Sequence, residues 1–209
     1  MLMPMPNIEA NPAVPRESAQ ANLQYIRRTL EAAGRLSSVS GGGMVAVGCL
    51  ALVAVELNLR FTAAPWDSGA GPAALSVWAG LLILSAAVTA FAMARKARRA
   101  GQIFWSPVLR KALAIATAPM LLGALLSAAA LRDVNLARLP LIWLGCYGAA
   151  LASAGVISVS PVRWMGICFM VLAIAALFAT PAAGLALLAA GFGGLHLLFG
   201  GYIYWRLDG

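Results

Sequence analysis

The most constraining feature of this chain is a series of six long apolar stretches. A helix needs about 20 consecutive apolar residues to cross the hydrocarbon core of a bilayer. Backbone amides inside hydrocarbon must be paired within the structure, and the alternating pattern of barrel strands is absent, so each stretch is predicted to be a helix. The stretches are residues 43–62, 74–94, 112–131, 139–158, 164–180 and 184–204. The predicted fold is all-α, a six-helix transmembrane bundle.

The composition agrees with this prediction and excludes most cytosolic enzymes. Of 209 residues, 62% are hydrophobic and only 11% are charged, whereas soluble domains average about 25% charged residues. The three cysteines, Cys49, Cys146 and Cys168, lie in apolar stretches and show no metal-binding spacing. We interpret them as packing residues and expect no metal and no cofactor.

Two segments precede the bundle. The proline-containing residues 1–16 are predicted to be a flexible tail. Residues 17–42 are predicted to form an amphipathic interfacial helix on the cytoplasmic side, followed by a glycine-rich linker. The apolar positions of that helix are Leu23, Ile26, Leu30 and Ala33. Residues 43–209 then form the transmembrane domain.

The distribution of basic residues predicts the orientation. Of the 15 Lys and Arg residues, only Arg60, Arg132 and Arg138 fall on one side of the predicted bundle. Cytoplasmic loops of membrane proteins collect Lys and Arg, so both termini are predicted to be cytoplasmic. The same rule explains the net charge of +8 without nucleic acid as a partner.

A basic segment with aromatic residues follows the second span. Such segments beside a span are typical of adhesion to an anionic leaflet, and docking of an acidic soluble partner is the alternative. The predicted membrane-surface residues are Arg95, Lys96, Arg98, Arg99, Trp105, Arg110 and Lys111.

Glu56 is an ionisable residue inside the first span. A carboxylate in a span is costly and suggests a function such as proton or ligand transport. Arg60 lies four residues later, in the order that favours an ion pair within one helix. The sequence leaves both interpretations open.

His196, the only histidine, lies in the last span on a stripe of small residues. Ala189, Gly193 and Gly200 share its helical face, and Gly148 belongs to a similar stripe in the fourth span. Small residues at this spacing allow close helix packing, within one chain or between copies. We therefore expect His196 to lie in a tight seam and to make an interhelical hydrogen bond.

The chain also resembles rhomboid intramembrane proteases in its six spans, with a serine in span four and a histidine in span six. That resemblance implies a nucleophilic Ser153 activated by His196. However, Ala154 replaces the second glycine of the rhomboid Gly-x-Ser-Gly signature, and the tryptophan-arginine pair of the first loop is missing. A packing role for Ser153 is the favoured interpretation, and no residue is assigned as catalytic.

Three segments resemble a group of small bacterial six-span membrane proteins without an established activity. They are residues 24–31 with the glycines at 41–43, residues 161–170, and residues 191–200. The resemblance implies a location in the bacterial inner membrane and adds no catalytic residue.

Together these patterns favour a non-catalytic accessory subunit or assembly partner in the membrane. Its expected partners are the anionic cytoplasmic leaflet and another membrane protein or a second copy of the chain. A small transporter that uses Glu56 and His196 is the alternative.

Overall fold

The computed structural model describes residues 21, 22, 24, 36, 38–61 and 71–207. The chain separates into two compact units, Met1–Arg35 and Leu36–Gly209. Of the first unit, Ala21, Asn22 and Gln24 are described, and all three are helical. The predicted tail at 1–16 and most of the predicted amphipathic helix lie outside the described residues.

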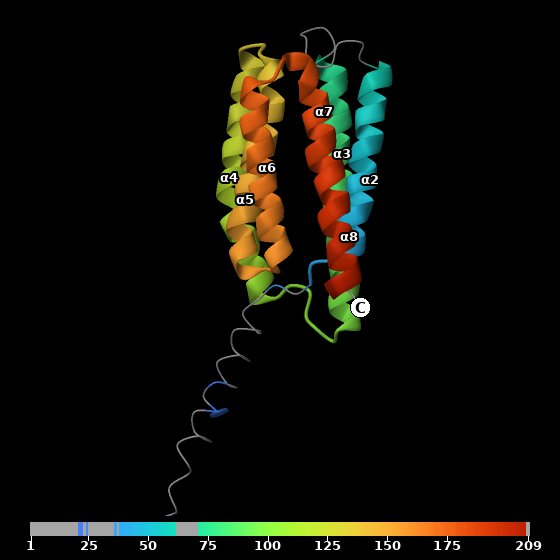
Figure 1. Ribbon diagram of the computed structural model, residues 1–209, viewed down its shortest axis with the longest axis vertical. Helices are drawn as coiled ribbons and strands as arrows, with labels where there is room; N and C mark the ends of the chain where they lie inside the picture. Colours follow the sequence, from blue (N-terminus) through green and yellow to red (C-terminus); the bar gives the residue numbers. More distant parts are fainter. Residues whose placement is uncertain (1–20, 23, 25–35, 37, 62–70, 208–209) are drawn as a thin grey trace, which may run out of the picture. The chain divides into compact units, whose positions relative to one another are not determined.

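The second unit is built from helices, which confirms the predicted all-α six-helix bundle (Figure 1). Six helical segments are long and apolar enough to cross a membrane, so the chain is a multi-pass membrane protein. Spans one to three are α2 (Gly41–Phe61), α3 (Gly71–Arg99) and α4 (Pro107–Arg132). Span four is η1 (Leu136–Arg138), α5 (Leu139–Ala154) and η2 (Gly155–Ile157), and span five is α6 (Ser160–Phe178). Span six is η3 (Pro181–Ala183), α7 (Gly184–Leu188), the π-helical η4 (Ala189–Leu195) and α8 (His196–Leu207).

The helices around the basic segment are longer than the predicted spans. Residues 95–99 form the last turns of α3, and residues 107–111 form the first turns of α4, so only 100–106 is a loop. The apolar pattern marks where hydrocarbon ends, but Lys and Arg are good helix formers and continue the helix into water. Basic residues at the end of α3 also complement the partial negative charge of a helix C-terminus.

Proline and serine define several helix starts. Four prolines each lie in the first turn of a helical segment: Pro107, Pro140, Pro161 and Pro181. Backbone N–H groups in a first turn have no hydrogen-bond acceptor within the helix, so a proline there costs no hydrogen bond. At the start of α4, the Ser106 hydroxyl accepts a hydrogen bond from the Leu109 amide at 3.2 Å. This cap satisfies one of the four orphan N–H groups of a helix N-terminus.

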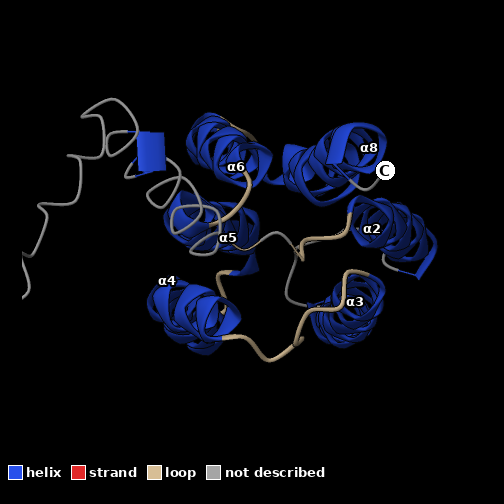
Figure 2. Ribbon diagram, turned by 90° about the horizontal axis from the view of Figure 1, so that it is seen from below, coloured by secondary structure: helices blue, strands red, loops and turns tan. Residues whose placement is uncertain are grey.

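Spans that follow one another in the sequence pack on each other, with one exception (Figure 2). α2 packs on α3, α4 packs on α5, and α5 packs on α6. Span six lies between α6 and α2 and joins the last spans to the first. By contrast, α3 and α4 do not pack along each other in the described part of the chain, although the loop 100–106 connects them.

Glycines allow the closest helix contacts. A β-carbon on Gly200 would lie 2.8 Å from the Met44 β-carbon and 2.9 Å from the Val45 amide nitrogen. A β-carbon on Gly148 would lie 2.8 Å from the Gly166 carbonyl oxygen. Distances this short are incompatible with a side chain, so α2 approaches span six, and α5 approaches α6, backbone to backbone.

The adjacent glycines Gly200 and Gly201 provide a matched test of this packing. Gly200→Ala is expected to lower the free energy of unfolding by about 1–3 kcal/mol, because the new β-carbon meets the α2 backbone. A β-carbon on Gly201 meets nothing within 4 Å, so Gly201→Ala should be neutral or stabilising by up to about 1 kcal/mol. SDS titration in mixed micelles, followed by circular dichroism, measures both. Equal effects of the two substitutions would contradict the close contact.

Candidate functional site

The candidate site is an apolar cavity of about 430 Å³ inside the bundle. It lies where α3 and α4 do not pack on each other, and α5, α2 and span six form its remaining walls. Its size is in the range of pockets that hold small molecules. The lining residues include Ala51 of α2, Trp78 and Ser85 of α3, Ser127 of α4, Trp143 and Tyr147 of α5, and Phe192 and His196 of span six.

His196 is held in the cavity wall by a hydrogen bond between helices. Its Nε2 atom lies 3.0 Å from the Tyr147 hydroxyl oxygen, and the histidine is only 3% exposed. Phe169 and Phe192 complete an aromatic cluster, with ring centroids 5.0 to 5.2 Å from Tyr147 and from each other. The interhelical hydrogen bond expected for His196 is therefore present, and Tyr147 is its partner.

The π-helical segment before His196 determines what surrounds the other ring nitrogen. The backbone carbonyls of Gly191 and Phe192 lie beside the imidazole, but Nδ1 makes no hydrogen bond of good geometry with any described residue. Carbonyl oxygens only accept, so they favour the tautomer that carries its proton on Nδ1. In this tautomer the Tyr147 hydroxyl donates to Nε2.

Two tryptophans, Trp78 and Trp143, also line the cavity. The Trp143 Nε1 donates to the Ser127 hydroxyl at 3.0 Å, and that hydroxyl donates to the Gly123 carbonyl at 2.7 Å. The Trp78 ring packs on Trp143 and Phe192, with centroid distances of 5.7 and 6.0 Å. Trp78 thus connects α3 to α5 and span six across the cavity.

Two polar atoms in the cavity wall lack a partner among the described residues. They are Trp78 Nε1 and Ser85 Oγ, and both are buried from solvent. A buried polar atom without a hydrogen bond costs about 1–3 kcal/mol. The wall therefore holds unused hydrogen-bonding capacity in apolar surroundings.

The cavity borders the lipid-facing surface of the bundle. Leu82 of α3 and Met120 of α4 line it, and they are 62% and 39% exposed. These two side chains lie at the interruption between α3 and α4. A lipid-soluble molecule that enters between these helices needs no passage through water.

The structure places Glu56 outside this site. The Arg60 Nε donates to the Glu56 carboxylate at 2.7 Å, and the two side chains are 71% and 54% exposed, respectively. Neither residue lines the cavity. The intrahelical ion pair is therefore present, and Glu56 and His196 are not brought together in one site.

Ser153 and His196 also differ in their surroundings. Ser153 is exposed, whereas His196 is buried and its Nε2 bonds to Tyr147. No hydrogen bond between Ser153 and His196 is present among the described residues, so the pair that the rhomboid resemblance implies is not formed there. Among the described residues, no group of three or more His, Cys, Asp or Glu residues could hold a metal ion.

The sequence interpretation selected His196 but missed the residues around it. Tyr147 and Trp78 are aromatic residues in apolar spans, and Ser127 is one of several span serines, so nothing in their spacing distinguishes them. Of the predicted packing residues, Gly193 and Gly200 lie against α2 and Gly148 lies against α6. Ala189 begins the π-helical segment.

Comparison with protein-family models, with curated proteins and with solved structures finds no match to this chain.

A double-mutant cycle tests the hydrogen bond between Tyr147 and His196. Tyr147→Phe and His196→Leu should each lower the free energy of unfolding in mixed micelles, because each leaves a buried polar group or a void. We expect a coupling energy of about 0.6 kcal/mol and at most about 1.7 kcal/mol, the mean and the maximum measured by such cycles for hydrogen bonds between membrane helices. Tyr202→Phe is the control, because Tyr202 is 55% exposed and lies outside the cavity. A coupling near zero would contradict the bond.

Proposed function

We propose that this protein is a non-catalytic membrane protein that binds a lipid-soluble molecule in its interior cavity. The observation that carries the proposal is the combination of an apolar cavity of about 430 Å³ with unpaired polar atoms in its wall. Apolar walls with a few polar groups are typical of small-molecule sites. The exposed lining residues Leu82 and Met120 support entry from the bilayer.

The chemistry of the wall specifies one property of the ligand. An indole N–H can only donate, so a partner for Trp78 Nε1 must be an acceptor. A carbonyl or ether oxygen on a mainly apolar molecule meets this need and leaves the rest of the cavity filled by hydrocarbon. Since the indole nitrogen is covered in the structure, binding also requires a small rotation of the ring.

An accessory role in a larger membrane assembly remains part of this proposal. It is supported by the scarcity of ionisable groups in the middle of the described spans, where His196 is already bonded to Tyr147. Ion-coupled transport through Glu56 has less support, because Arg60 neutralises this exposed carboxylate outside the cavity. Isolation in a mild detergent tests the accessory role: a partner that co-purifies in fixed proportion is expected.

The location proposed is the bacterial inner membrane, with both termini in the cytoplasm. The excess of Lys and Arg at one end of the bundle supports this orientation.

Cysteine labelling checks the orientation. In a variant without the three native cysteines, Val134→Cys should react with a membrane-impermeant maleimide in intact bacterial cells. Gln102→Cys should react only after the membrane is permeabilised, because its loop is on the basic side. Val134 is 63% exposed and Gln102 is also exposed, so both probes are accessible. The opposite labelling pattern would reverse the proposed orientation.

Ligand binding can be measured with a tritiated short-chain alkyl benzoquinone as a carbonyl-bearing probe. Scintillation proximity on immobilised protein should show saturable binding. Unlabelled quinone should displace the probe, and the corresponding alkylbenzene, which has no carbonyl, should displace it only at about fivefold higher concentration. Trp78→Phe should weaken binding about fivefold, because one net hydrogen bond is lost.

Trp164→Phe is the control for this experiment. Trp164 is 60% exposed and lies outside the cavity, so its substitution should leave the affinity unchanged. Equal displacement by the alkylbenzene, or equal affinity of the Trp78→Phe variant and the unaltered protein, would overturn the proposed recognition.

A further inference from the structure

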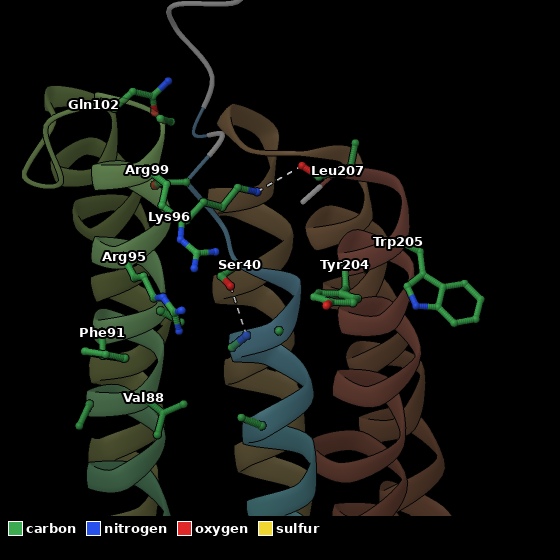
Figure 3. A pocket seen from close by; sticks show the side chains of 17 residues that line it. Ser40, Val88, Phe91, Arg95, Lys96, Arg99, Gln102, Tyr204, Trp205 and Leu207 are labelled. Atoms are coloured by element: carbon green, nitrogen blue, oxygen red, sulfur yellow. Dashed lines mark hydrogen bonds between the residues drawn. The ribbon is translucent and has the colours of Figure 1, made fainter. Parts of the chain in front are cut away.

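A second hollow lies on the bundle at the end that carries Arg95, Lys96 and Arg99, which we call the basic end. This groove has a volume of about 1400 Å³ and lies between α3 and the start of α2, with the end of α8 on its far side (Figure 3). Its lining includes Ser40, Gly42 and Gly43 near the start of α2, Val88, Phe91, Arg95 and Arg99 of α3, and Tyr204 and Trp205 of α8. None of the residues that line the interior cavity lines this groove.

Glycines form the floor of the groove. Gly42 and Gly43 leave the first turn of α2 without side chains, and a β-carbon on Gly42 would lie at an ordinary 3.7 Å from the Tyr204 ring. The Ser40 hydroxyl accepts a hydrogen bond from the Gly43 amide at 3.3 Å, which holds the start of the helix. The floor is thus the partially positive N-terminal end of a 21-residue helix.

Two guanidinium groups lie along one wall. Arg95 and Arg99 are four residues apart, so they project from the same face of α3, and both line the groove. Neither makes an ion pair or hydrogen bond with any described residue. Lys96 has a structural role beside them, because its ammonium donates to the carbonyls of Val39 at 2.9 Å and Leu207 at 3.4 Å.

The groove is apolar on the side of the bilayer. Phe91 lies one helical turn, about 6 Å, from Arg95 toward the middle of α3, and Val88 follows in the same direction (Figure 3). Phe91 is 70% exposed, although it lies in a span. The Arg95 and Arg99 guanidinium groups therefore lie next to the apolar side chains of Phe91 and Val88 in the groove wall. Tyr204 lies at the end of its span, where amphipathic aromatic rings prefer the lipid headgroups.

We propose that this groove binds one anionic phospholipid of the bilayer. The phosphate lies between Arg95 and Arg99 over the start of α2, and an acyl chain runs along Phe91 and Val88. Charge complementarity supports the headgroup contact, and the continuous apolar wall below favours a lipid over a free anion. The site is more selective than general adhesion to an anionic leaflet, because Arg98 and Arg110 are exposed at the same end but do not line the groove.

Native mass spectrometry of the full chain in detergent micelles tests the site. The unaltered protein should retain one phosphatidylglycerol in preference to phosphatidylcholine. The double variant Arg95→Gln, Arg99→Gln should bind phosphatidylglycerol about 25-fold more weakly, since each charge contributes about fivefold. The matched variant Arg98→Gln, Arg110→Gln removes the same charge outside the groove and should change the affinity less than about twofold.

Two further measurements distinguish the lipid from its headgroup alone. Excess inorganic phosphate should not displace the lipid, because it cannot use the apolar wall. Gly42→Phe should place a ring over the start of α2, where the phosphate is proposed to lie, and abolish retention. The helical circular dichroism should stay unchanged, because a β-carbon at this position meets only ordinary contacts. Equal losses in the two double variants, displacement by phosphate, or full retention in Gly42→Phe would each overturn the proposal.

Discussion

The arrangement of this bundle depends on the glycine contacts between its first and last spans. Apolar side chains gain nothing from leaving lipid for another helix, so membrane helices associate through close packing and hydrogen bonds. Gly48 and Gly200 supply that packing, because neither has room for a β-carbon. The contact brings the start of the transmembrane domain beside its end. As a result, the interruption in the series of neighbours falls between α3 and α4, where the cavity lies.

Polar groups in the bundle are paired in two different ways, within one helix or between helices. The Glu56–Arg60 pair is complete within one helix and needs no neighbour. Tyr147 with His196, and Trp143 with Ser127, instead pair across helices and fix which faces meet. An unpaired polar group is expensive in such surroundings. The remaining unpaired atoms of the cavity wall are therefore the part of the bundle where a ligand oxygen would gain most, which links the packing to the proposed function.

Much of the fold could be predicted because hydrophobicity is a local property. The apolar stretches located all six spans, and the spacing of Gly193, His196 and Gly200 indicated a seam. The end of α3 was less predictable, since the apolar signal stops before the helix does. The partner of His196 could not be predicted, because many aromatic and hydroxyl residues lie in the spans and their pairing depends on how helices rotate against one another.

The sequence alone determined that this chain crosses a membrane six times as helices, because the backbone in hydrocarbon has no other way to pair its amides. It also determined that Arg60 follows Glu56 at the distance of one turn. Only the tertiary structure decided that Trp78 and Tyr147 share a cavity with His196, and that Arg95 and Arg99 share a groove with α2 and α8. These groups of residues come from different parts of the chain, and helix packing brings them together. That packing depends on the shapes of the helix surfaces, which the spacing of apolar residues in the sequence does not give.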